Sequence, residues 1–140
     1  MREASFKIIE HTADIGIRVK SSSLVSLFKC AALAITAISS QKQKIQYPKK
    51  YEIVIKQEAE GLEELFVNWL NELLSVSSAE ALVFEDIRIN QISEKFIHAV
   101  AIGIDIRNYK INTEIKAATY HQVKVKKIGR IWQAEVIFDV

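Results

Sequence analysis

Two segments of the chain carry apolar residues at the three- and four-residue spacing of an amphipathic helix. The first follows Ser23, whose hydroxyl suits a helix N-cap, and ends near residue 39. The second spans residues 62–74, with Glu63 and Glu64 in the first turn, where the helix dipole favours acids. The polar residues 75–80 are expected to form a connection. The apolar stripes consist of Leu24, Leu27, Phe28, Ala31, Ala32, Ile35 and Ile38 in the first helix, and of Leu62, Leu65, Phe66, Trp69, Leu70, Leu73 and Leu74 in the second.

Alternation of apolar and polar residues predicts strands in much of the remaining chain. The clearest case places Ile15, Ile17 and Val19 on one face of a strand. Short turns at residues 93–94 and at Gly129 predict two antiparallel hairpins. Strands are expected at residues 6–10, 15–20, 51–59, 82–92, 95–106, 115–127 and 131–140, with loops at 39–50 and 107–113. This order of elements predicts an α+β fold, in which two amphipathic helices pack on one face of a mostly antiparallel sheet.

Length and composition indicate one domain with its own core. The chain has 140 residues, of which 49% are hydrophobic and 26% are charged. A domain of this size buries roughly 68% of the surface that its unfolded chain exposes, so it does not depend on disulfides for a core. We therefore expect a single domain over residues 1–140.

The cysteine content and the lack of long apolar runs favour a cytoplasmic location. Cys30 is the only cysteine, which excludes an internal disulfide and a multi-cysteine metal site. It lies on the apolar side of the first predicted helix, and we interpret it as a small hydrophobe rather than a nucleophile. No stretch approaches the roughly 18 apolar residues of a membrane span, and residues 1–10 lack the apolar region of a signal peptide.

The charges are nearly balanced, which argues against nucleic-acid binding by bulk electrostatics. Nineteen basic residues face seventeen acidic ones, giving a net charge of +2, whereas domains of that kind usually show a strong basic excess. Lys42, Lys44, Lys49 and Lys50 fall in a predicted loop, and we interpret them as a solvated surface. The composition therefore predicts that RNA is contacted only indirectly.

A polar break separates the first two predicted strands. Residues 11–14 bring together the imidazole of His11, the hydroxyl of Thr12 and the carboxylate of Asp14. Such breaks usually favour Gly, Asn or Pro, so this composition is a candidate for chemistry. The alternative is that Asp14 simply bonds nearby backbone amides in a turn.

The last two residues supply anionic groups. Phe138 is expected to face the core, which directs Asp139 to the opposite side, and Val140 carries the terminal carboxylate. If the last strand pairs near the first, Asp14 adds a third carboxylate, and such a group needs a cation or a proton to offset its repulsion. Oxygen ligands of this kind suit Ca²⁺, Mg²⁺ or Mn²⁺. The alternative is a frayed terminus with solvated charges.

A third polar cluster lies in residues 114–121. Thr119 and His121 alternate with Tyr120, so their polar groups share one face of a strand, and Lys116 is followed by small apolar residues. The alternative is a half-exposed strand whose histidine is satisfied by local bonds.

Taken together, these segments resemble the archease family over essentially the whole chain. The resemblance is carried by His-Thr-Ala-Asp-Ile-Gly at residues 11–16, Asn-Trp-Leu-Asn-Glu-Leu-Leu at 68–74, Ala-Leu-Val-Phe at 81–84, Glu-Ile-Lys-Ala-Ala-Thr-Tyr-His at 114–121 and the closing Asp139 and Val140. Their order along the chain is the order expected for the family.

The resemblance implies a non-enzymatic activator of the RtcB-type tRNA ligase in tRNA splicing and RNA repair. Family members promote guanylylation and multiple turnover of that ligase, which uses GTP and Mn²⁺. The resemblance assigns a divalent ion, usually Ca²⁺, to Asp14, Asp139 and Val140. It also implies a role for Lys116 in partner activation. His11, Thr12 and His121 belong to the same motifs, and we expect them to act there too.

Two other functions are compatible with the same residues. One is a chaperone or modulator of a tRNA-modifying enzyme such as a methyltransferase. The other is a small metal-dependent phosphohydrolase, in which the carboxylates would activate water; too few bridging acids are evident for a two-metal site. We expect a monomer or weak homo-oligomer with a protein partner.

Overall fold

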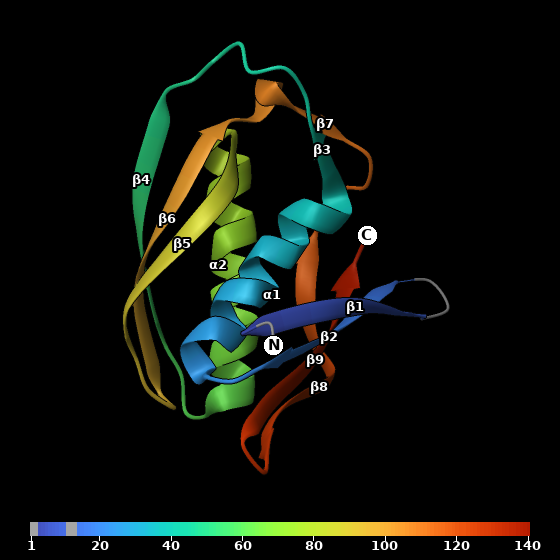
Figure 1. Cartoon of the computed structure of the whole chain (residues 1–140), viewed down its shortest axis with the longest axis vertical. Helices are drawn as coiled ribbons and strands as arrows, with labels where there is room; N and C mark the ends of the chain where they lie inside the picture. The colour runs from blue at the N-terminus through green and yellow to red at the C-terminus, as the bar shows by residue number, and fades with distance from the viewer. Residues whose placement is uncertain (1–2, 11–13) are drawn as a thin grey trace.

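In the computed structural model, which describes residues 3–10 and 14–140, the two long helices lie between two antiparallel sheets (Figure 1). The α+β class, the two helices and the mostly antiparallel strands are therefore confirmed. In chain order the elements are β1 (Ala4–Glu10), β2 (Ile15–Ser21), α1 (Leu24–Ser39), β3 (Ser40–Lys42), β4 (Lys50–Glu58), α2 (Leu62–Glu80), β5 (Leu82–Ile92), β6 (Phe96–Asp105), the 3-10 turn η1 (Ile106–Asn108), β7 (Tyr109–Ile111), β8 (Ala117–Ile128) and β9 (Ile131–Asp139).

The strands divide among three sheets rather than forming one. One has the order β1-β2-β9-β8, the second has the order β4-β6-β5, and β3 pairs with β7 in a small third sheet. The predicted hairpins β5–β6 and β8–β9 are present. Because β9 lies between β2 and β8, the last strand pairs directly with an early one.

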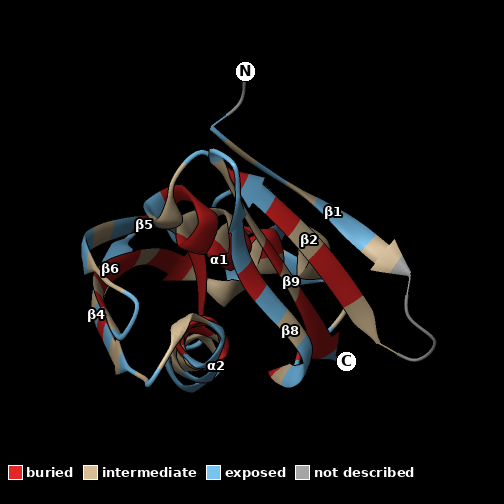
Figure 2. Ribbon diagram, turned by 90° about the horizontal axis from the view of Figure 1, so that it is seen from below, coloured by how far each residue is buried: buried red, intermediate tan, exposed pale blue. Residues whose placement is uncertain are grey.

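The core fills the space between the two larger sheets. Figure 2 shows buried positions on both helices and on strands of both larger sheets. Phe28 of α1 and Phe66 of α2 meet edge to face, with ring centroids 5.2 Å apart, and Trp69 Nε1 donates to the Phe28 carbonyl oxygen over 3.1 Å. Burying each such side chain contributes about 1.5–3 kcal/mol. The helix stripes read from the sequence are thus the surfaces that join the two sheets.

The start of α1 is capped as predicted. The hydroxyl of Ser23 accepts a hydrogen bond from the backbone N–H of Ser26 over 3.1 Å. That bond satisfies one of the amide donors left without a partner in the first helical turn.

The second helix is longer than its sequence pattern predicts. It continues through residues 75–80, which had been expected to form a polar connection, and ends at Glu80. Serine only weakly disfavours a helix interior, and Val76 still packs against the core. Ala81 then adopts the left-handed conformation, with φ of 54°, and its N–H bonds the Ser77 carbonyl to close the helix.

The segment 39–50 was expected to be a loop, but it contains the short strand β3. Its remainder is held by Asn108, whose side chain is fully buried. Asn108 Oδ1 accepts from the backbone N–H groups of Gln46 and Tyr47 at 2.9 and 3.0 Å, and its Nδ2 donates to the Tyr47 carbonyl at 2.8 Å. One amide thus fixes a turn that local sequence rules do not specify.

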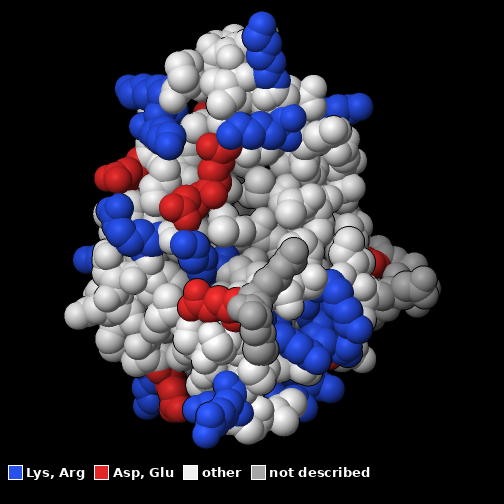
Figure 3. All heavy atoms as spheres, in the orientation of Figure 1, with Lys and Arg blue, Asp and Glu red and all other residues white. Residues whose placement is uncertain are grey.

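Charged side chains tie the small sheet to β5. Glu85 accepts from Lys42 Nζ and from the Tyr109 hydroxyl, each over 2.6 Å. Partial burial raises the pKa of Glu85, but these two hydrogen bonds outweigh it and hold that pKa below its usual value. Burial and the bond to Glu85 raise the pKa of Tyr109. The upper part of the face in Figure 3 shows acidic and basic side chains interleaved in this way.

Candidate acidic site at the end of the four-stranded sheet

The pairing of β2 with β9 brings two predicted site residues together. Ile15 lies opposite Phe138, and the next residue outward on each strand is Asp14 and Asp139, respectively. Asp139 is exposed, whereas Asp14 lies half-buried in the bend before β2. The early polar break and the end of the chain therefore meet at one end of this sheet.

Lys116 belongs to the same group. Its backbone N–H donates to the Asp139 carbonyl oxygen over 2.9 Å, immediately before β8 begins with the pairing of Ala117 and Asp139. The Lys116 side chain is exposed. Val140, which follows Asp139, is 40% exposed. The structure thus groups Asp14, Lys116, Asp139 and Val140.

Alternation along the strands explains why the carboxylate of Asp139 points away from the core. Ile17, Val136 and Phe138 are buried against the helices, so Asp139 has the opposite orientation.

Next to this end, Gly16 lies under Ile9. A Cβ added at Gly16 would lie 3.2 Å from Ile9 Cγ1 and 3.3 Å from the Ile9 carbonyl oxygen. The absence of a side chain at Gly16 allows the close approach of β1.

Thr119 is a polar group without a described partner beside this end of the sheet. It pairs with Ile137 and alternates with the buried Ala118, which places it on the same face as Asp139. Its Oγ1 is inaccessible to solvent and finds no hydrogen-bond partner in the described part of the chain. Buried hydroxyls normally have a hydrogen-bond partner, so the Thr119 hydroxyl is an exception among the described residues of this face.

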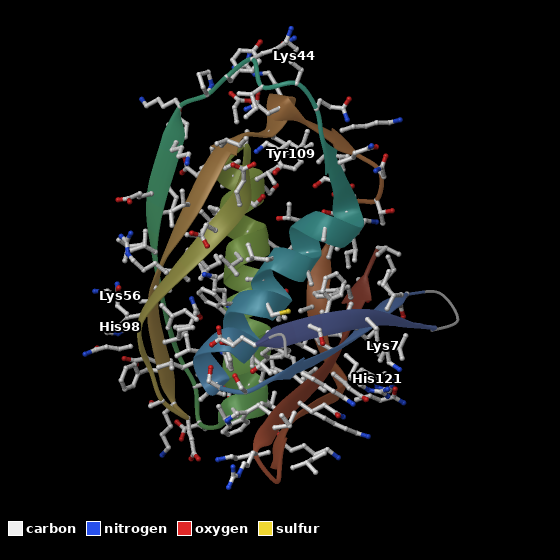
Figure 4. The ribbon with its side chains drawn as sticks, in the orientation of Figure 1. Lys7, Lys44, Lys56, His98, Tyr109 and His121 are labelled. Atoms are coloured by element: carbon white, nitrogen blue, oxygen red, sulfur yellow. The ribbon has the colours of Figure 1, made fainter. Side chains whose placement is uncertain are left out.

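His121 lies apart from the acidic group. The pairing of β8 with β9 shifts between Thr119 and Lys124, and Gln122 in the intervening bulge has a φ of 57°. His121 is exposed in this bulge, four residues along β8 from the Ala117–Asp139 pair, and Figure 4 labels it on the right-hand side of the molecule. The predicted residues His11 and Thr12 lie outside the described residues.

The acids do not form a metal cage of side chains alone. Across residues 3–10 and 14–140, no group of three or more His, Cys, Asp or Glu side chains is arranged to hold a metal ion. The oxygen donors of the described residues here are the carboxylates of Asp14 and Asp139 and the main-chain oxygen atoms of Val140. These oxygen donors, taken from the described residues, suit a hard cation.

A cavity of about 690 Å³ opens beside Lys116. It lies among α1, α2, the start of β5 and residues 111–116. Its walls combine apolar side chains such as Ile35, Leu74 and Phe84 with polar ones, including Asn71 and Glu114. Sequence periodicity could not predict it, because it forms where separate elements meet.

Asn71 is a further residue that the sequence patterns did not single out. It lies on α2, yet its side chain bonds both backbone groups of Ala118, the residue after Ala117 on β8. It therefore holds the strand that leads from Lys116. The sequence signals were its place in the motif at residues 68–74, which did not indicate a role, and a polar residue beside an apolar stripe, which is common on helix surfaces.

Cys30 is half-buried on α1, and burial raises the pKa of its thiol. It packs against the core, in line with its interpretation as a small hydrophobe.

The fold defines a class of small α+β proteins in which paired early and late strands lie beside two helices. The chain shares this fold with the solution structure of Methanobacterium thermoautotrophicum protein 1598, with a TM-score of 0.72, 24% identity, and coverage of 96% of this chain and 98% of that one. It is also similar to a crystal structure from Thermotoga maritima described as an archease and possible chaperone. That comparison gives a TM-score of 0.65, 26% identity, and coverage of 100% and 98%.

Sequence comparison identifies the family. The Archease protein family profile matches residues 6–140. The chain is 38% identical to the Pyrococcus furiosus protein archease, covering 94% of this chain and 95% of that protein. It is 33% identical to the Methanosarcina barkeri protein archease, covering 96% and 95%. The chain belongs to the archease family. Among the described residues, no helix is long and apolar enough to cross a membrane.

Proposed function

We propose that this chain activates an RtcB-type RNA ligase in tRNA splicing and RNA repair, by promoting guanylylation and multiple turnover of that enzyme. The pairing of β2 with β9 carries the proposal. It places Asp14 and Asp139 together at one end of a sheet. The backbone bond from Lys116 to Asp139 adds the exposed Lys116 to this group, where a partner can reach it. Membership of the archease family supports a role in which the chain acts on a partner protein, and the ligase is the partner that we propose.

The proposal includes a divalent ion, held by Asp14 and Asp139 with the carboxylate of Val140. The donor set fits, since all its atoms are oxygens. Ca²⁺ is the proposed ion, with Mg²⁺ or Mn²⁺ as alternatives. When bound, such an ion neutralises phosphate charge during nucleotidyl transfer.

Lys116 would present its ammonium group to the ligase or its nucleotide. Its backbone bond to Asp139 fixes where that side chain begins, at the same end of the sheet as the carboxylates. Positive charge placed at a site of phosphoryl chemistry stabilises the charge that develops in the transition state. His11, Thr12 and His121 are proposed to contribute to partner contact from the adjoining segments.

The proposed role is that of a cofactor protein rather than an enzyme. The thiol of Cys30 packs against the core on α1, and burial raises its pKa, so it is poorly suited to act as a nucleophile. Metal-dependent hydrolysis of phosphoesters by the purified chain alone would contradict this view and favour a phosphohydrolase.

A single-turnover guanylylation assay of the ligase tests the proposal. We expect Asp14→Asn, Asp139→Asn and Lys116→Ala each to lower stimulation by at least roughly tenfold. Asp86→Asn and Lys56→Ala are matched controls, because both residues are exposed on the other large sheet. Unchanged stimulation by the three variants would reject the acidic end as the working surface. Addition of a few residues after Val140 should impair a site that uses its carboxylate.

The description of the Thermotoga maritima relative as a possible chaperone favours a second candidate. In that case the chain would assist a tRNA-modifying enzyme such as a methyltransferase. Co-purification with such an enzyme, together with no effect on ligase guanylylation, would support this function over the first.

A further inference from the structure

The outer face of the four-stranded sheet carries a row of charged residues that crosses all four strands. Strand pairing aligns Lys7 of β1 with Arg18 of β2, Arg18 with Glu135 of β9, and Glu135 with Lys124 of β8. The adjacent row in the same register consists of Ser5, Lys20, Gln133 and Lys126. These two rows, termed the basic face, hold five cations and one acid.

Burial shows that the basic face points away from the core. Val19, Val125 and Ala134 alternate with its residues and are buried, whereas Lys7 and Lys124 are exposed. Lys20 and Lys126 are exposed as well. Neighbouring strands lie about 4.8 Å apart, so the four lysines fall within a patch roughly 15 Å wide. Figure 3 shows basic side chains gathered over the β1–β2 region of this sheet, where Figure 4 labels Lys7.

The one acid of the basic face is already engaged. Glu135 Oε1 accepts from Arg18 Nε over 2.6 Å, and the Glu135 side chain is only 19% exposed. The charges of Arg18 and Glu135 cancel each other, so the four lysines account for the net positive charge of the basic face. The whole chain carries only +2, so the fold concentrates its positive charge here and leaves the remainder slightly acidic.

A short uncharged row separates the basic face from the acidic end of the same sheet. It consists of Ile9, Gly16, Ile137 and Thr119. From Glu135 to Asp139 the distance along β9 is four residues, or roughly 13 Å. A ligand lying on the basic face would therefore extend toward the carboxylates of Asp14 and Asp139.

The composition of the basic face favours a phosphate backbone over a protein surface. Protein interfaces are depleted in lysine and enriched in aromatic residues at their centres. The two rows contain four lysines and neither an aromatic nor an aliphatic side chain. Flexible ammonium groups on a sheet suit a polyanion with repeating charges, and such contacts need no base-specific geometry.

We propose that the basic face binds the phosphate backbone of single-stranded RNA directly. The choice of RNA over DNA rests on the proposed function, whereas the recognition of phosphate rests on the charge rows alone. Although the net charge predicted only indirect contact with RNA, that value cannot show where the charges lie.

Fluorescence anisotropy of the isolated chain tests the proposal, using a labelled single-stranded RNA of about 20 nucleotides at several salt concentrations. The test variant is Lys7→Ala/Lys124→Ala. The matched control is Lys44→Ala/Lys56→Ala, which removes the same charge from exposed residues that Figure 4 shows on other parts of the molecule. Lys7→Arg/Lys124→Arg keeps the charge and tests whether the fold tolerates substitution.

We expect the test variant to bind RNA about tenfold more weakly and to reduce the slope of log affinity against log salt by about 1.4, at roughly 0.7 per phosphate contact. The control and the arginine variant should bind like the original chain. Equal loss in the control would overturn the proposal, because bulk charge would then explain binding. Failure of the original chain to bind RNA would also overturn it, as would preference for polyglutamate, which would indicate an acidic protein partner.

This result can be separated from the proposed function. The ligase is absent from the binding assay, so a lack of effect of Asp139→Asn on guanylylation would reject the activator role without changing the RNA measurement. Conversely, normal ligase stimulation with no RNA binding would leave the activator role in place.

Discussion

The side chain of Asn71 bonds both backbone groups of Ala118. Ala118 N donates to Asn71 Oδ1 over 2.7 Å, and Asn71 Nδ2 donates to the Ala118 carbonyl over 3.0 Å. Because β8 is an edge strand, these groups would otherwise lack a strand partner. One amide thus links α2 to the strand that follows Lys116 and covers part of an exposed edge.

Replacement of Asn71 should destabilise the fold. Asn71→Asp keeps the acceptor but places a carboxylate beside the Ala118 carbonyl, and we expect a loss of about 1–3 kcal/mol in the free energy of unfolding. Urea denaturation measures it. Asn68→Ala is the comparison, since Asn68 bonds the exposed hydroxyl of Tyr120 and should cost less than about 1 kcal/mol. Equal losses would mean that the two hydrogen bonds between Asn71 and Ala118 contribute no more to stability than the single bond of Asn68.

Gly16→Ala should destabilise the β1–β2 hairpin. The new methyl group would press on Ile9 at 3.2 Å and on its carbonyl oxygen at 3.3 Å, so β1 must shift. We expect a loss of roughly 1–3 kcal/mol in unfolding free energy, measured by denaturant titration. Gly61→Ala is the comparison, because a Cβ there meets nothing within 4 Å; Gly61 is the N-cap of α2, so this variant should lose less than about 1 kcal/mol. A Gly16 variant as stable as the control would contradict the close packing of β1.

Calcium should raise the melting temperature of the isolated chain. At about 100 times its Kd, a ligand that binds only the folded state adds about 2.7 kcal/mol, which corresponds to roughly 5–10 °C for a chain of this size. Differential scanning fluorimetry with Ca²⁺, Mg²⁺ and Mn²⁺, each reversed by chelator, measures the effect. Asp139→Asn should abolish it and Asp86→Asn should not. An undiminished shift in Asp139→Asn would exclude this carboxylate as a ligand.

Acidification should erase the contribution of Glu85 to stability. Its folded-state pKa lies below that of the unfolded chain, so its bonds to Lys42 and Tyr109 stabilise the fold above the ordinary glutamate pKa of about 4.3. That contribution is lost as the pH falls through the lower, folded-state pKa. Glu85→Gln should therefore melt below the original chain at pH 7 and converge with it once the pH is below that lowered pKa. The exposed Glu58→Gln should change little at either pH, and a constant difference for Glu85→Gln across the range would argue against the ionised bonds.

Cys30 should react slowly with thiol reagents. Burial raises the pKa of its thiol, so little thiolate is present at pH 7–8, and the side chain is only partly accessible. Labelling with iodoacetamide, followed by mass spectrometry, should be slower than for glutathione and should accelerate in denaturant. Fast labelling of the folded chain would reopen the interpretation of Cys30 as a nucleophile.

Local sequence patterns predicted much of the secondary structure. The helix stripes, the Ser23 cap and the hairpins at residues 93–94 and Gly129 follow from periodicities of 3.6 and 2 residues, which are read within one element. The predicted end of α2 near residue 74 was wrong, because the packing of Val76 and the cap at Ala81 extend the helix through its serine-rich last turns. Strand alternation and the polar break indicated Asp14, Asp139 and Val140 as candidate ligands, whereas the roles of Lys116 and of a divalent ion came from the family resemblance.

By itself, the sequence determined the elements and their buried faces, because each depends on neighbours a few residues away. Only the tertiary structure decided that β9 inserts between β2 and β8, that Asn71 covers β8, and that lysines from three strands share one face. These features depend on which strands pair and in what register. Pairing is settled by burial of both sheets against two helices at once, a condition on the whole chain that no local pattern contains.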